Sequence, residues 1–273
     1  MKELSTRAIS GAIYISLLIL SIYWQYLLVA LFFVFGLICM AEFKKLIQLK
    51  SKAPYIVFTL MYAGFSVWAI VPGLDAGFNE AIKILQVLTI FVQLFLIKDL
   101  FSEKTIPLFE SKRYILTTFY LASAFIFLIL IANNDKTFTP MLLLGVFVLI
   151  WINDTGAYLV GKNFGKQKLF PSVSPKKTVE GFMGGLFFAC LASYFIATLT
   201  DTLDFTNWLI LSIIASVFGT LGDLIESKFK RQAGVKDSGV IMPGHGGLLD
   251  RLDSIIFAAP FFYLFLRLFP YVS

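Results

Sequence analysis

Nine long apolar stretches divide the chain, and each approaches the length that a membrane-spanning helix requires. Crossing the hydrocarbon core takes about 20 mostly apolar residues in a helix. The stretches predict helices at residues 8–24, 26–43, 54–72, 80–97, 114–131, 140–160, 182–200, 206–226 and 248–268. Polar residues gather in the short segments between them, so we expect an all-α polytopic membrane protein with about nine transmembrane helices.

The composition agrees with a membrane protein and excludes an ordinary soluble domain. Apolar residues make up 58% of the 273 positions and charged residues 15%, whereas soluble domains contain about 45–50% and about 25%. Cys39 and Cys190 are the two cysteines, and both lie inside apolar stretches. This placement indicates neither a disulfide framework nor a thiolate metal site.

Positive charge is distributed unevenly between alternate loops, and the asymmetry predicts the orientation. With a cytoplasmic N-terminus, 20 of the 23 lysines and arginines fall on the cytoplasmic side, and only Lys83, Lys136 and Arg267 lie outside. Positive residues accumulate on the cytoplasmic side of membrane proteins. The N-terminus is therefore predicted inside and, after nine spans, the C-terminus outside. Lys44 and Lys45 are interpreted as topology determinants that meet anionic lipid headgroups.

The chain divides into two regions rather than into separate soluble domains. Residues 1–113 are predicted to form N-terminal transmembrane helices with short basic cytoplasmic loops. Residues 114–273 are predicted to form a C-terminal transmembrane catalytic region, with cytoplasmic active-site loops at 161–181 and 227–248. In these two loops basic residues alternate with Gly, Ser, Pro and Asp in a way that topology alone does not require.

Two aspartates lie near the predicted inner ends of transmembrane helices. Asp154 follows a long apolar run in the sixth span, and Asp223 lies near the end of the eighth, with Gly219 and Gly222 beside it. An ionisable group at this depth is costly, which makes it a candidate for function. For Asp154 the alternative is a solvated helix-end residue that pairs with Lys162.

The loop at 161–181 contains a pair of lysines in an unusual setting. Pro171 and Pro175 interrupt the chain ahead of Lys176 and Lys177, so we expect the lysines at the start of a helix. Lysines beside N-terminal helix amides bind phosphate oxygens well. The alternative is a lysine pair that only determines topology.

The start of the ninth span carries a dense group of polar residues. Asp250 and Asp253 are three positions apart, so they share one face of a helix. The preceding Gly246 and Gly247 are expected to leave backbone N–H groups available for an anion. Carboxylates beside such amides suit Mg²⁺, which keeps waters and bridges substrate phosphates. The single histidine, His245, has two open roles, a hydrogen-bonded loop residue or a direct substrate contact.

These residues together resemble the phosphatidate cytidylyltransferase family, also called CDP-diacylglycerol synthases. The resemblance depends on a long spaced signature formed by Ser227, Lys230, Arg231, Lys236, Asp237, Pro243, His245, Gly246, Gly247, Asp250, Arg251 and Asp253. Three shorter motifs support it: DTGAY from Asp154, SPKKTVEG from Ser174 and EFKK after the second span. The rest of the first 140 residues agrees with the family only in hydropathy.

The resemblance implies a nucleotidyltransferase of phospholipid biosynthesis that converts CTP and phosphatidate to CDP-diacylglycerol and pyrophosphate. It further implies Mg²⁺ as cofactor, with a second cation left open, and an active site at the cytoplasmic face of the cell membrane. The fold that it implies is all-helical, membrane-embedded and usually homodimeric, with membrane lipid and no nucleic acid as partner.

The site residues follow from the residue types and from this resemblance. The attacking phosphate oxygen is already an anion, so we expect catalysis by positioning and charge neutralisation. The expected metal ligands are Asp223 and Asp250, with Asp154 and Asp253 as further or outer ligands. Besides Asp223 and Asp250, the catalytic group comprises Lys176, Lys177, His245 and Arg251. The substrate-binding group comprises Ser174, Lys230, Arg231, Lys236, Gly246 and Gly247.

Two other functions stay open at this point. One is a related nucleotidyl or phosphoryl transferase that acts on another lipid phosphate, since phosphate sites look alike in sequence. The other is a membrane transporter. A transporter is less compatible because the acids of an ion pathway are spread through the bilayer, whereas these acids cluster at the predicted cytoplasmic ends.

Overall fold

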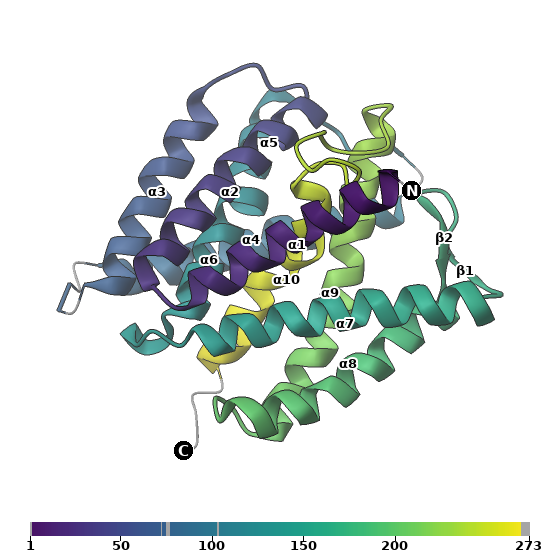
Figure 1. Cartoon of the computed structure of the whole chain (residues 1–273). Coiled ribbons are helices and arrows are strands. Elements are labelled where there is room, and N and C mark those ends of the chain that lie inside the picture. The colour runs from purple at the N-terminus through teal and green to yellow at the C-terminus, as the bar shows by residue number, and fades with distance from the viewer. Residues whose placement is uncertain (1, 72, 75–76, 103, 269–273) are drawn as a thin grey trace.

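Long helices dominate the computed structural model (Figure 1). The structure describes residues 2–71, 73–74, 77–102 and 104–268, without the side chains of residues 2–8 and 135. The helices before residue 137 are α1 (Lys2–Ile22), α2 (Gln25–Leu46), α3 (Ala53–Ile70), α4 (Phe78–Phe101), α5 (Glu110–Ile115), the π-helical η1 (Leu116–Ala122), α6 (Ser123–Ala132) and the short η2 (Asn134–Lys136). After them come α7 (Pro140–Phe164), α8 (Val179–Thr200), α9 (Phe205–Gln232) and α10 (Leu249–Leu268).

Every apolar stretch predicted from the sequence coincides with helical structure. Within the described residues, seven helices are long and apolar enough to cross a membrane, when Glu110–Ala132 is taken as one helix. Helix α1 adds a shorter apolar part at Ile9–Ile22, and α10 has three charged residues near its start. A polytopic helical membrane protein is therefore confirmed, whereas the number nine and the orientation stay predictions. The C-terminus predicted to lie outside falls on residues 269–273, beyond the described part.

The helix at Glu110–Ala132 forms the centre of the bundle. All side chains of α6 are buried, and η1 connects α5 to α6 without a break. The centre of the Tyr120 ring lies 5.3 Å from the centre of the Phe43 ring on α2 and 6.2 Å from that of the Phe229 ring on α9. The central helix thus joins the N-terminal helices to the helices that carry the candidate site.

Contacts between α4 and α10 also tie the two predicted regions together. The Gln93 side chain donates to the Phe257 carbonyl at 3.1 Å, and that of Gln86 donates to the Pro260 carbonyl at 2.7 Å. Both carbonyls lie near Pro260, which has no N–H of its own to donate within α10. A neighbouring helix commonly supplies polar partners around such an interruption in a membrane.

Helices α7 and α8 run side by side in close contact (Figure 1). A Cβ atom added at Gly184 would lie 2.5 Å from the Val160 side chain, and one at Gly185 would lie 2.7 Å from the Asn153 carbonyl. These glycines allow the two helices to approach closely. This approach places the start of α8 beside the cytoplasmic half predicted for α7.

A small antiparallel hairpin lies between α7 and α8. Strand β1 (Lys168–Phe170) pairs with β2 (Ser174–Thr178), with Lys168 opposite Thr178. This hairpin is an exception within an otherwise helical structure, and Lys176 and Lys177 lie on β2, directly before the first residues of α8 and not within the helix. Pro175 disfavours helix at Ser174 and is tolerated in an edge strand, which agrees with the extended backbone of β2.

Helix α8 begins after the hairpin, where side chains satisfy its first amides. The Thr178 hydroxyl caps it by accepting from the Gly181 N–H at 3.1 Å. The Glu180 carboxylate accepts from the Lys166 and Gln167 N–H groups at 3.0 and 3.1 Å. The Glu180 bonds attach the start of α8 to the residues between α7 and β1.

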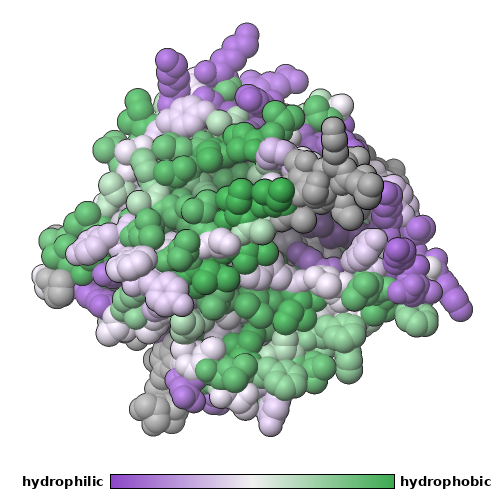
Figure 2. Space-filling view, in the orientation of Figure 1, coloured by the Kyte–Doolittle hydropathy of each residue, from purple (hydrophilic) through white to green (hydrophobic). Residues whose placement is uncertain are grey.

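The surface separates apolar from polar regions. Figure 2 shows hydrophobic residues over the middle of this face and hydrophilic residues along its upper and right-hand edges. The right-hand edge holds β1 and β2 in Figure 1. This distribution agrees with apolar helices in a lipid environment and with a polar end that carries the hairpin.

Candidate active site

A cavity of about 650 Å³ opens where α7, α8, α9, α10 and the hairpin meet. Its lining includes the carboxylates of Asp154, Asp223, Asp250 and Asp253. It also includes the basic side chains of Lys162, Lys168, Lys176, Lys177 and Arg251. Seven of the residues predicted from the sequence therefore line one cavity, although they come from four separate segments of the chain.

An ion pair crosses this cavity from the hairpin to α9. The Lys177 ammonium lies 2.7 Å from Oδ2 of Asp223. Burial acts to lower the pKa of Lys177, but the Asp223 carboxylate outweighs burial and the pKa is raised above its ordinary value. Lys177 is therefore a firmly charged cation inside the cavity, whereas the neighbouring Lys176 is exposed.

A second lysine lies between carboxylates beneath the cavity. Lys230 on α9 forms ion pairs with Glu226, one turn earlier, and with Oδ1 of Asp250 at 2.7 Å. Glu226 is fully buried and Lys230 is only 8% exposed. Lys230 is not among the lining residues, so its predicted contact with a substrate phosphate would require these ion pairs to open.

The backbone amides around the glycines bind anions, but the anions are carboxylates of the protein. Asp250 Oδ2 accepts from the N–H groups of Gly247 at 2.7 Å and Ser238 at 2.9 Å, and from the Ser238 hydroxyl at 2.9 Å. The Gly246 carbonyl accepts from the Met242 N–H at 2.9 Å. The expectation of a free Gly247 amide for a phosphate is therefore wrong, because Asp250 takes this amide.

The remaining predicted residues are not among those that line the cavity. His245 Nδ1 lies 2.7 Å from the Ser10 hydroxyl of α1, and the Arg251 guanidinium donates to the His245 carbonyl at 2.7 Å. Arg231 donates to the Val235 carbonyl at 3.2 Å, and Lys236 is exposed. Ser174 is half-buried at the start of β2. Substrate contacts by these residues stay predictions.

Three residues next to the site received no role from the sequence. Glu42 of α2 accepts hydrogen bonds from the first amides of α10. Ser238 contacts Asp250, and Glu226 pairs with Lys230. The sequence indicated Glu42 and Glu226 only in that each is an ionisable residue inside an apolar stretch, where such a residue is a candidate for function. Nothing in the sequence indicated which distant groups they would meet.

The acidic residues suit an oxygen-ligated divalent cation that is shared with a substrate. Asp154, Asp223, Asp250 and Asp253 all line the cavity, and Mg²⁺ binds through one or two carboxylates, waters and phosphates. Within the described residues, no three acidic, histidine or cysteine side chains form a preassembled metal site. The residues therefore fit a cation that arrives with phosphates and do not fit a cage made by the protein alone.

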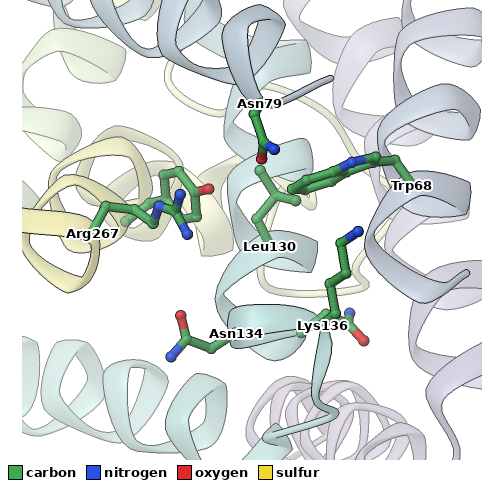
Figure 3. Close-up of a pocket in the computed structure, with 8 residues that line it drawn as sticks. Trp68, Asn79, Leu130, Asn134, Lys136 and Arg267 are labelled. Atoms are coloured by element: carbon green, nitrogen blue, oxygen red, sulfur yellow. The ribbon is translucent and has the colours of Figure 1, made fainter. Parts of the chain in front are cut away.

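A smaller cavity of about 220 Å³ lies at the other ends of the helices (Figure 3). Its lining includes Trp68 near the end of α3, Asn79 near the start of α4 and Arg267 near the end of α10. The Lys136 ammonium lies 5.2 Å from the centre of the Trp68 ring. No carboxylate is among its described lining residues, so it does not repeat the chemistry of the larger cavity.

Comparison with known proteins assigns the chain to a family. The model of the cytidylyltransferase family matches residues 5–269, nearly the whole chain. The chain belongs to the cytidylyltransferase family. It is accordingly a nucleotidyltransferase, and the resemblance noted in its sequence is confirmed.

Curated relatives of this cytidylyltransferase come from bacteria. The phosphatidate cytidylyltransferase of Bacillus subtilis (strain 168) is 42% identical over 190 residues, which cover 69% of this chain and 68% of the relative. The phosphatidate cytidylyltransferase of Staphylococcus aureus (strain COL) is 52% identical over 120 residues, covering 43% and 46%. That of Staphylococcus haemolyticus (strain JCSC1435) is 51% identical over the same length.

Proposed function

We propose that this chain transfers the cytidylyl group of CTP to phosphatidate, which yields CDP-diacylglycerol and pyrophosphate. The relatives that carry the name phosphatidate cytidylyltransferase support this substrate pair. The observation that carries the proposal is one cavity in which four aspartates and five basic residues meet at the ends of apolar helices. Such a cavity accepts polyphosphate and cation together, next to the surface where a lipid phosphate lies.

The reaction joins two polyanions, and the charged residues of the cavity serve to bring them together. An oxygen of the phosphatidate phosphate forms a bond to the α-phosphorus of CTP, while the bond from that phosphorus to the bridging oxygen of the β-phosphate breaks. Pyrophosphate leaves with the electron pair of that bond. No general base is needed, because the attacking oxygen carries a negative charge. The residues act by orientation and by charge stabilisation.

The basic residues divide between the two sides of the cavity. Lys176 and Lys177 project from the hairpin and Arg251 from α10. Lys177 is charged and paired with Asp223. An arriving phosphate group would replace the Asp223 carboxylate as the partner of the Lys177 ammonium. This exchange leaves Asp223 available for a cation. His245, Arg231 and Lys236 remain proposed phosphate contacts at the rim.

Asp223 and Asp250 are the proposed ligands of Mg²⁺, with Asp154 and Asp253 beside them. A bound Mg²⁺ would neutralise the phosphate oxygens and stabilise the charge that develops on pyrophosphate. Among the described residues, Lys230 is the partner of Oδ1 of Asp250, and a carboxylate oxygen accepts more than one contact. Asp250 therefore keeps acceptor capacity for a cation while Lys230 stays in place.

The placement in the cell and the assembly are also proposals. A cytoplasmic active site in the cell membrane agrees with the positive charge of the loops that surround the cavity. CTP is available on that side. A homodimer is proposed from the resemblance alone, and size measurements on the detergent-solubilised protein test it.

The function is tested by pyrophosphate release from the purified, detergent-solubilised protein. CTP, Mg²⁺ and phosphatidate are each omitted in turn, and the lipid product is identified by mass. We expect release only when all three are present. Asp223→Asn should reduce turnover by at least about 100-fold, as expected when charge stabilisation of the transition state is lost. Glu80→Gln, at an exposed position at the start of α4, is the matched control and should keep normal turnover.

The same assay also distinguishes phosphatidate from other lipid phosphates as the substrate. Release with another lipid phosphate but not with phosphatidate would overturn the substrate assignment and keep the transferase reaction. Release with phosphatidate that survives Asp223→Asn would overturn the role of the cavity.

A further inference from the structure

A carboxylate from the N-terminal half of the chain is inserted beside the candidate active site. Glu42 on α2 is 2% exposed. Its Oε2 accepts from the Leu249 N–H at 2.8 Å, and its Oε1 from the Leu248 N–H at 3.2 Å. The first amides of a helix have no partner within the helix, and a negative charge at this end is favourable. Glu42 thus caps α10 from a position more than 200 residues earlier in the chain.

The loop before α10 is shaped to fit around this carboxylate. A Cβ atom at Gly239 would lie 2.2 Å from Glu42 Oε1. One at Gly247 would lie 2.2 Å from the Ser238 hydroxyl and 2.7 Å from both oxygens of Glu42. Any side chain at these two positions would collide with the buried carboxylate. The glycines therefore allow the loop to close on Glu42.

The segment that Glu42 holds is also the segment that orients Asp250. The Gly247 N–H, the Ser238 N–H and the Ser238 hydroxyl are the donors to Asp250 Oδ2. The same hydroxyl lies 3.4 Å from Glu42 Oε2, and its single proton favours the shorter contact to Asp250. Ser238 is therefore in contact with both carboxylates.

We propose that Glu42 is a positioning residue for Asp250. Glu42 does not line the cavity and acts through the backbone of Ser238 and of residues 247–249. By holding this backbone, it keeps three donors on Oδ2 and directs Oδ1 towards Lys230 and the cavity. The inference rests on the proposed function, because it takes Asp250 as a residue of the transfer reaction.

Glu42→Gln is the first test, because glutamine has nearly the same size. It has one acceptor oxygen and directs an NH₂ group at backbone donors, so the start of α10 should loosen. Loss of a residue that orients a metal ligand commonly costs about 10- to 100-fold in metal affinity or activity. We expect the Mg²⁺ concentration for half-maximal turnover to rise by about this factor. The KM for phosphatidate should stay within about twofold, since Glu42 contacts no substrate.

Two further measurements separate positioning from simple helix capping. Hydrogen exchange at the amides of Leu248 and Leu249 should become faster in Glu42→Gln. Mn²⁺ binding in the presence of CTP, followed by electron paramagnetic resonance, should weaken about 10-fold or more. Lys45→Gln is the matched control, since Lys45 is exposed on the same helix, and should change neither. Faster exchange with wild-type Mn²⁺ binding and wild-type Mg²⁺ dependence would mean that Glu42 only caps α10, and the proposal would be overturned.

A second variant covers the case in which Glu42→Gln does not fold. Ser238→Ala removes a smaller group and should also raise the Mg²⁺ requirement, whereas an unchanged requirement would overturn the proposal. Failure of the proposed function gives a different result, namely no turnover of CTP and phosphatidate by the wild-type protein. In that case Mn²⁺ binding in the presence of CTP still decides, because binding that is measurable and equal in wild type and Glu42→Gln would refute positioning.

Discussion

Helices α9 and α10 pack closely at Gly222, beside the cavity, and we predict that a side chain at this position lowers activity. A Cβ atom at Gly222 would lie 2.6 Å from the Cβ of Phe257 and 2.7 Å from the backbone carbonyl oxygen of Asp253. Neither atom can turn away through a side-chain rotation. Relief of both clashes to an ordinary contact of 3.4 Å requires the two helices to separate by about 0.8 Å. Gly222→Ala should therefore move Asp223, on one helix, relative to Asp253, on the other.

Activity should respond to this displacement more than stability does. Overpacking costs about 1–3 kcal/mol of unfolding free energy, and replacing a helical glycine by alanine returns about 0.5–1 kcal/mol. The net loss is thus at most about 2.5 kcal/mol. A misplacement near 1 Å, however, can cost about 100-fold in rate. We expect Gly222→Ala to lower kcat by about 10- to 100-fold while the protein remains folded.

Gly219→Ala on the same helix is the matched control. Its Cβ would meet only Cδ1 of Ile150 at 2.9 Å, which is the flexible end of a side chain, and the Ser254 Cβ at an ordinary 3.6 Å. Turnover should therefore stay within about threefold of wild type. Pyrophosphate release and thermal unfolding in detergent are measured for both variants. If Gly222→Ala matched Gly219→Ala in kcat and in unfolding temperature, close packing of α9 and α10 would not be what positions the acids.

The other predictions concern the lysines and the metal. Lys228→Met should lower the unfolding free energy by about 1–3 kcal/mol, because the Lys228 ammonium donates to the carbonyls of Asp99, Leu100 and Ser102 at the end of α4. Its kcat per folded molecule should not change, and a lower kcat would place this lysine in the reaction. Lys177→Met should reduce turnover by at least about 100-fold and Lys176→Met by much less, since only Lys177 pairs with Asp223; equal effects would contradict this distinction. Removal of divalent cations by EDTA should abolish turnover, leave the helical circular dichroism unchanged and be reversed by Mg²⁺; turnover that persists in EDTA would refute the metal proposal.

The helices of this chain depend mainly on consecutive residues, whereas the contacts within the site depend on residues that are far apart in the sequence. The apolar stretches predicted the helices well, because hydrophobic length and helix formation are properties of consecutive residues. The signature near the C-terminus predicted Asp250, Arg251 and Asp253, and the ionisable residues at the ends of spans predicted Asp154 and Asp223; all five line the cavity. The hairpin was missed because β1 and β2 contain only three and five residues. Strands this short have too little alternation of polar and apolar positions to be recognised.

Consecutive residues alone predict a helical membrane protein and most of the charged residues that line its larger cavity. Which of these charges meet depends on the fold. It pairs Lys177 with Asp223, places Lys230 between Glu226 and Asp250, and inserts Glu42 at the start of α10. These partners are separated by up to about 200 residues, and no periodic pattern relates them. A buried charge must find a partner to offset its desolvation, but which partner it finds depends on how the helices pack.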